Sequence, residues 1–137
     1  MKQIVYFLLA TSLTCGFWAC GNHAHSDDAN QAHKVANIAW KDLAHMDTVQ
    51  LGDTVTYGYV FFNTGWKPVK LENAKARTGN ITFRLPTKET LVGEQDTLWA
   101  TSIFSTPGQN GHYFDVTHNT PQRPFLLALH VWVEDHE

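Results

Sequence analysis

One β-rich stretch, residues 51–68, constrains the fold of this chain most strongly. It begins at the turn formers of residues 51–53, and β-branched and aromatic residues then fill it as far as Asn63-Thr64-Gly65. Its apolar side chains recur at a period of two, so one face of a strand carries Val55, Tyr57, Tyr59 and Phe61. Val60 and Phe62 make the opposite face partly apolar. We therefore predict a central strand rather than an edge strand.

Further runs of alternating hydrophobicity surround this stretch, and none has a helical period. They occupy residues 37–41, with a continuation after a break at 44–49, and then 69–74, 81–86, 98–104, 112–118 and 125–133. Turn formers separate them, most strongly at residues 106–111. This order predicts an all-β fold, an antiparallel β-sandwich of about seven strands.

The composition excludes several classes of function. The 137 residues suffice for one domain, and 10 basic against 13 acidic side chains give a formal charge of −3. Nucleic-acid binding requires a basic surface, so we expect no such partner. Cys15 and Cys20 both precede the predicted sandwich. The sandwich therefore has neither a disulfide nor a thiolate metal site, and we expect no cofactor.

The N-terminus has the pattern of an export signal. A lysine precedes an apolar run, residues 4–19, that is short for a membrane span and suits a signal peptide. Ala19-Cys20-Gly21 resembles a lipobox, although Phe17 departs from the usual small or branched residue. We predict a signal peptide at 1–19, a lipidated Cys20 with a flexible tether at 20–36, and an immunoglobulin-like sandwich at 37–137. The alternatives are an ordinary secretory signal and a short membrane anchor.

The tether contains three histidines, His23, His25 and His33. Neutral imidazoles bind copper, nickel or zinc, so these residues are candidate metal ligands. The alternative is a solvated linker in which the histidines are incidental, because a flexible arm fixes no coordination geometry. The histidines of the sandwich diverge in direction, with His112 and His118 facing the core and His130 facing outward, so we expect no shared metal site there.

The last two predicted strands place aromatic residues together on one outer face. If residues 119–124 join a hairpin, Tyr113 lies near His130, and Trp132 lies diagonally beyond. Such side chains bury a large area at low entropy cost. We predict that Tyr113, His130 and Trp132 bind a protein partner. The alternatives are that the first strand or the tether covers this face, or that it is exposed aromatic surface without a partner.

Two other tryptophans lie outside this group. Trp66 follows the Asn-Thr-Gly turn and is a second binding candidate, although we expect it to pack over the end of the sandwich. Trp99 falls on the outward face of its strand, where we expect it to cover the other sheet.

Three Asp-Thr-apolar triplets resemble an O-glycosylation acceptor used on exported proteins of some bacteria. Their threonines are Thr48, Thr54 and Thr97. Because Asp-Thr is also common where a strand begins, a purely local structural role is the alternative.

We find no pattern that indicates catalysis. Beyond the leader, the serines are Ser26, Ser102 and Ser105, and none lies in a recognisable nucleophile setting. Patterns for a phosphate-binding loop, a zinc protease helix and an EF-hand are also absent from the sequence. We therefore expect a non-catalytic domain.

A set of short motifs occurs in a characteristic order over about residues 37–135. They are Leu51-Gly52-Asp53, Tyr59-x-Phe61-x-Asn63-Thr64-Gly65-x-x-Pro68, Phe104-Ser105-Thr106, Gly111, Asn119 and the alternating run 127–133. This order resembles the bacterial domain-of-unknown-function 1573 family, and more widely ASH-type and major-sperm-protein-type domains. The resemblance implies an immunoglobulin-like sandwich in an exported protein, with a binding or structural role.

One loop departs from that family. Many members carry Cys-Gly-Cys after the third strand, where this chain has Thr78-Gly79-Asn80. A redox or thiolate-metal role implied by that motif therefore does not carry over, whereas a turn at Gly79 can remain.

Taken together, the sequence predicts a non-catalytic exported lipoprotein, anchored by its lipid to the outer membrane on the periplasmic or surface side. We expect its sandwich to bind a protein of the cell envelope or to serve a structural role. The alternative functions are copper or zinc binding through the tether histidines, and glycan binding at the cell surface.

Overall fold

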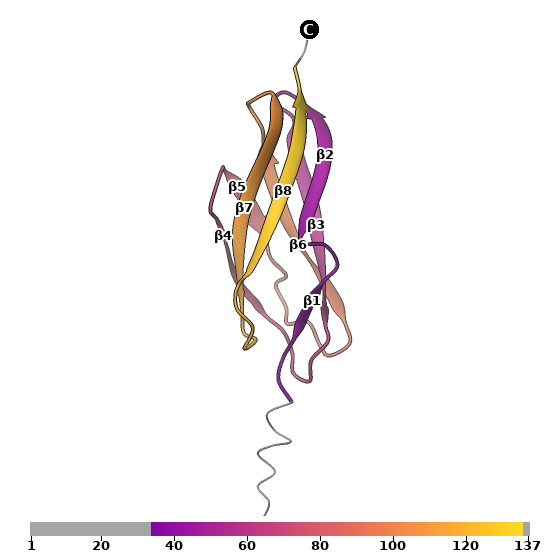
Figure 1. Ribbon diagram of the computed structural model, residues 1–137. Coiled ribbons are helices and arrows are strands. Elements are labelled where there is room, and N and C mark those ends of the chain that lie inside the picture. The colour runs from indigo at the N-terminus through magenta and orange to yellow at the C-terminus, as the bar shows by residue number, and fades with distance from the viewer. Residues whose placement is uncertain (1–33, 136–137) are drawn as a thin grey trace, which may run out of the picture.

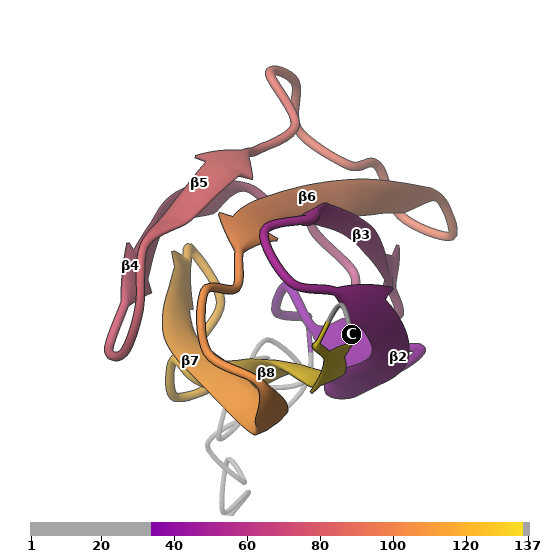
Figure 2. The same ribbon diagram turned by 90° about the horizontal axis from the view of Figure 1, so that it is seen from above.

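A computed structural model describes residues 34–135, which form two packed β-sheets (Figures 1 and 2). The strands are β1 (Ile38–Trp40), β2 (Ala44–Gln50), β3 (Thr54–Asn63), β4 (Leu71–Ala76), β5 (Ile81–Arg84), β6 (Gln95–Ile103), β7 (Gly108–His118) and β8 (Phe125–Glu134). One sheet has the order β1-β3-β6-β5 and the other β2-β8-β7-β4. The predicted all-β sandwich is confirmed. In this part of the chain no helix could span a membrane.

The prediction that residues 44–49 continue the first strand is wrong. β1 pairs antiparallel with β3, where Ile38 is opposite Asn63, whereas β2 pairs parallel with β8, where Met46 is opposite His130. The break at residues 41–43 lets the chain cross from one sheet to the other. The sandwich therefore has eight strands and one parallel pair, rather than about seven antiparallel strands.

The predicted central strand is confirmed as β3, which lies between β1 and β6. Its inward face buries Val55, Tyr59 and Phe61, as the period of two indicates. Tyr59 is fully buried, and its hydroxyl donates a hydrogen bond of 2.6 Å to the carbonyl oxygen of Ala128 in the opposite sheet. This bond satisfies the polar group that Tyr59 brings into the core, so the side chain also ties the two sheets together.

The turn predicted at residues 106–111 is shorter than expected. β7 already begins at Gly108, which pairs with Val133 of β8. The side-chain amide of Asn110 donates hydrogen bonds to the carbonyl oxygens of Thr106 and Gly108, at 2.7 and 2.9 Å. These bonds close the turn early, because they satisfy two backbone acceptors that a longer loop would leave to water.

Candidate functional site

The outer face of β2, β8 and β7 carries the three predicted residues and also a methionine. We call Met46, Tyr113, His130 and Trp132 the aromatic face. The exposed fractions of Met46, Trp132 and Tyr113 are 70%, 54% and 37%, and His130 is half-buried. Met46 lies opposite His130 in the strand register, and Gln109 lies opposite Trp132. Sequence reasoning missed Met46, because its neighbour on β8 depends on a parallel pairing that no local pattern indicates.

Tyr113 and His130 make the contact that the hairpin geometry predicts. Their ring centroids lie 5.4 Å apart and the rings are nearly perpendicular, at 84°. Gly111, directly opposite His130 in the register, provides the space, since a Cβ atom there would lie 2.8 Å from His130 Nδ1. The His130 ring therefore packs against β7 rather than pointing away from the sheet. This packing requires a residue without a side chain at position 111.

The free edges of both sheets have features that oppose addition of a further strand. β1 has only three residues, and β5 has four and is soon followed by Pro86. The edge strand β4 has a register shift between Leu71 and Asn73 and carries Lys75. Short strands, bulges, proline and lysine are the devices by which proteins discourage pairing at an edge. The faces of this sandwich are therefore better suited to binding than its edges.

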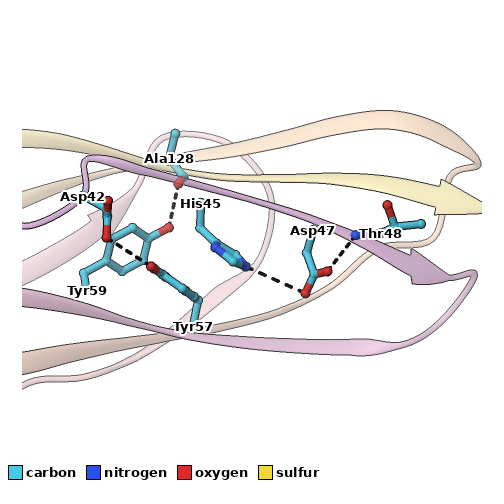
Figure 3. A network of polar contacts seen from close by, with 7 residues as sticks. All are labelled: Asp42, His45, Asp47, Thr48, Tyr57, Tyr59 and Ala128. Carbon is cyan, nitrogen blue, oxygen red and sulfur yellow. Dashed lines mark hydrogen bonds and ion pairs between the residues drawn. The ribbon is translucent and has the colours of Figure 1, made fainter.

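The remaining edge strand, β2, is protected by a polar network on its inward side (Figure 3). The His45 ring stacks on Tyr57 with 3.6 Å between centroids, and His45 Nε2 lies 3.8 Å from Asp47 Oδ2. The Tyr57 hydroxyl donates to Asp42 at 3.4 Å. Burial and the Asp42 carboxylate raise the pKa of Tyr57 above its ordinary value. An added strand at the free edge of β2 would remove water from these carboxylates and from the imidazole. The cost of that desolvation disfavours strand addition there.

Buried Ser102 and half-buried His112 lie close together, as a nucleophile and base do in a hydrolase, but the proton of the hydroxyl is directed elsewhere. Ser102 Oγ donates to the carbonyl oxygen of Asn80 at 2.6 Å and lies 2.8 Å from His112 Nδ1. Because the hydroxyl has one proton and donates it to Asn80, the His112 nitrogen donates to Ser102 rather than accepting from it. A general base must accept that proton, so the pair ties strands together and does not activate a nucleophile.

Burial disfavours the charged form of the two histidines that face inward, His112 and His118. Burial lowers the pKa of His112, whose ring stacks on Phe104 with 4.4 Å between centroids. Burial also lowers the pKa of His118, which hydrogen-bonds to Thr120 Oγ1 at 2.8 Å. Both imidazoles are therefore neutral structural groups near pH 7. Within residues 34–135, no three side chains of the metal-ligating types gather into a cluster.

The Thr78-Gly79-Asn80 loop keeps the turn that the family motif implies. Gly79 has a φ of +70°, and a side chain at this position would overlap the His112 ring. The glycine is thus required for two reasons, its backbone conformation and its closeness to a core histidine.

The three candidate glycosylation threonines lie at strand positions with local hydrogen bonds. Thr48 and Thr54 are exposed, and Thr97 is half-buried. In two of the triplets the aspartate accepts a hydrogen bond from the backbone N–H of the next threonine, at 2.8 Å for Thr48 and 2.7 Å for Thr97. These bonds account for the Asp-Thr pairing locally, and sugar attachment stays a prediction.

The other predicted sites lie outside the described residues. These are the lipidation site Cys20 and the candidate metal ligands His23, His25 and His33. They stay predictions.

Solved structures share the fold at low sequence identity. The ASH/PapD-like domain 7 of human CEP192 matches with a TM-score of 0.55 and 13% identity, over 76% of this chain and 89% of that one. The YadV chaperone matches with a TM-score of 0.51 and 16% identity, over 71% and 52%. The secreted serine protease VesC from Vibrio cholerae matches with a TM-score of 0.52 and 13% identity, over 79% of this chain but 25% of the protease.

A family model matches most of the described chain, whereas the individual solved structures share little sequence with it. No curated protein matches the chain. The fold and the motif order agree with one family of immunoglobulin-like domains, and neither the family description nor the ASH/PapD-like neighbours assign a catalytic role. The model of the family described as "Protein of unknown function (DUF1573)" matches residues 38–133, and this chain belongs to that family.

Proposed function

We propose that this chain is an exported lipoprotein whose sandwich binds a protein partner of the cell envelope through the aromatic face. The observation that carries the proposal is the continuity of exposed Met46 and Trp132 with half-buried His130 across β2 and β8, and with Tyr113 against His130 on β7. Aromatic residues and methionine are enriched at protein interfaces, and contiguous exposed apolar area marks binding surfaces. The sandwich serves as a non-catalytic adaptor.

The strand ladders support this assignment because they hold the face in one arrangement. β8 is hydrogen-bonded on both sides, to β2 and to β7, so Trp132 and His130 stand on the middle of a sheet. A rigid aromatic anchor loses little conformational entropy when a partner covers it. Protected edges direct a partner to this face rather than to a free strand.

Export and lipid attachment rest on the leader and on Cys20. A lipidated Cys20 would give the membrane attachment that the proposal requires.

The test is crosslinking in living cells, with tagged full-length chain, followed by pull-down and mass spectrometry. The variant is Trp132→Ala/His130→Ala. The matched control is Trp99→Ala/Arg84→Ala, which removes an exposed tryptophan and its neighbour from the other sheet. We expect one partner to be captured by the wild type and the control and to be lost in the variant, with melting temperatures unchanged. A partner set that is equal in all three proteins would contradict the proposal.

A glycan ligand is the second candidate, and the outer face of the other sheet favours it. The Trp99 ring lies over Gly58, where a Cβ atom would be 2.9 Å from the ring. The guanidinium of Arg84 is 5.5 Å from the ring centroid, and hollows of about 320 and 180 Å³ flank this pair. A flat exposed ring beside hydrogen-bonding groups suits a sugar. An oligosaccharide array would give a signal that Trp99→Ala abolishes and Trp132→Ala keeps; no signal for the wild type would exclude this function.

A further inference from the structure

The end of the sandwich where the described chain begins exposes three large apolar side chains on loops. Trp66, between β3 and β4, is 68% exposed, and Leu91 and Val92, between β5 and β6, are 53% and 51% exposed. The expectation that Trp66 packs over the end of the sandwich is therefore wrong. We call these three residues the Trp66 end. The two loops that carry them reach the bottom of the domain in Figure 1, opposite the end of β8.

Asn63 joins the two loops that carry these side chains. It is 2% exposed, and its side-chain amide donates to the carbonyl oxygens of Lys67 and Thr90, at 2.8 and 2.9 Å. Its side-chain oxygen accepts from the backbone N–H of Gly65 at 3.0 Å. The Asn63 backbone also pairs with Gly93 and Glu94, at 3.0 and 2.9 Å. One buried side chain thus fixes both loops, so Trp66, Leu91 and Val92 are presented together.

The N-terminal part of the described chain reaches the domain at the same end. The backbone N–H of Trp66 donates to the carbonyl oxygen of Val35 at 2.8 Å. Gly65 lies so close to the backbone of residues 35–37 that a side chain there would overlap it. Cys20 precedes Lys34 by fourteen residues. Fourteen residues span at most about 50 Å, so a lipid on Cys20 would keep this end, where the chain enters the domain, within that distance of the bilayer.

The charges at this end favour apolar insertion over electrostatic attraction. Lys67 flanks Trp66, and Lys88 precedes Leu91, whereas Glu89 and Glu94 lie in the same loop as Leu91 and Val92. Lys70 also lies in the loop of Trp66. All five charged side chains of the two loops are exposed, and their formal charges sum to only +1. Tryptophan is the side chain that membrane interfaces favour most clearly, because its ring is apolar and its N–H stays hydrated.

We propose that the Trp66 end docks on the lipid bilayer, with Trp66, Leu91 and Val92 inserted at the interface. This inference rests on the proposed lipid anchor at Cys20. In the docked state the strands extend outward from the bilayer surface. The aromatic face then lies on the side of the domain, where a partner can reach it. Because the charges of the two loops nearly cancel, docking occurs on zwitterionic lipid and changes little with salt.

The test is quenching of tryptophan fluorescence by brominated phosphatidylcholine, with full-length chain purified from membranes and reconstituted into vesicles. The variants are Trp66→Phe and Leu91→Ser/Val92→Ser, and the matched control is Trp132→Phe, which removes another exposed tryptophan. We expect Trp66→Phe to lose most of the quenching and Leu91→Ser/Val92→Ser to weaken it. Trp132→Phe should keep it, at low and high salt. Equal quenching in the wild type and Trp66→Phe would overturn the docking.

The intact mass of the same purified protein separates this inference from the proposal on which it rests. A chain with lipid on Cys20 but with quenching that does not depend on Trp66 overturns the docking and leaves the anchor. A chain without lipid overturns the anchor, and if it also fails to associate with the vesicles it overturns the docking as well. Quenching that depends on Trp66 supports the docking in either case.

Discussion

The aromatic face and the Trp66 end both expose large apolar side chains, but different forces hold them in place. The aromatic face stands on three paired strands, so backbone ladders fix it. The Trp66 end consists of two loops, and the side chain of one buried residue, Asn63, connects them. A side-chain change on the face should therefore affect binding alone, whereas a change at Asn63 should affect both the end and the stability of the domain.

The largest expected effect is that of Asn63→Ala. The substitution leaves the Gly65 N–H and the Lys67 carbonyl oxygen without their partner at a position that is 2% exposed, and it removes one of the two hydrogen bonds to the Thr90 carbonyl oxygen. Unsatisfied buried groups cost about 1–3 kcal/mol each, and water can reach some of them, so we expect the free energy of unfolding to fall by about 3 kcal/mol. Urea denaturation measures this value.

Asn119→Ala is the matched control at the same end. Its side chain also bonds two backbone groups, the N–H of Lys70 and the carbonyl of Pro68, at 2.9 and 3.2 Å, but it is exposed. Water replaces these bonds, so the loss should stay below about 1 kcal/mol. Equal losses in the two variants would mean that Asn63 does not hold the loops.

Next in size is the effect of Trp132→Ala on partner binding. A central tryptophan at an interface contributes about 2 kcal/mol or more, which corresponds to a loss of affinity of roughly 30-fold. Titration of the partner that crosslinking identifies would measure this loss. Trp66→Ala should leave the affinity unchanged in the absence of lipid. If both variants weaken binding equally, the aromatic face and the Trp66 end form one binding surface rather than two.

Gly111→Ala should have a smaller effect and test how His130 is placed. The new methyl group would meet the His130 ring, which must leave its position against Tyr113. Because the ring can tilt toward solvent, the cost in stability should be about 1 kcal/mol, and partner capture should fall with it. Gly58→Ala, which displaces Trp99 on the other sheet, should leave capture intact. Capture that survives Gly111→Ala would remove His130 from the binding surface.

Acidification should produce the smallest effect, and its source should be the inward histidines. Burial lowers the pKa of His112 and of His118, while an unfolded histidine titrates near about 6.5. Below that pH the unfolded chain binds protons that the folded chain resists, so the free energy of unfolding falls as pH decreases from 7 to 5. Urea denaturation at both values measures the decrease. His112→Gln/His118→Gln should reduce it; stability that increases toward pH 5 would contradict this assignment.

Much of the fold could be predicted because it depends on local alternation. The inward residues of β3 and β6, such as Tyr59, Leu98 and Ala100, follow from a period of two and are buried as expected. The contact between Tyr113 and His130 was also predictable, since a hairpin fixes which residues lie opposite each other. The family could be identified from the order of its turn motifs, because these motifs are also local features of the sequence.

The functional surfaces were harder to predict because they depend on residues far apart in the chain. Met46 joins His130 only through the parallel pairing of β2 with β8, and a crossing between sheets has no periodic signal. The Asn-Thr-Gly turn motif also gave no indication that the Asn63 side chain would bond to Thr90, twenty-seven residues away.

The sequence by itself determined that this chain forms strands, where their inward faces lie and which family they belong to. Those properties follow from side-chain alternation and turn chemistry within a few residues. Only the tertiary structure decided that Trp66, Leu91 and Val92 are exposed on two loops that Asn63 joins, and that one outer face is continuous from Met46 to Tyr113. The physical reason is that burial depends on the partner across the sheet or the next loop, and the choice among partners is made by the packed core as a whole.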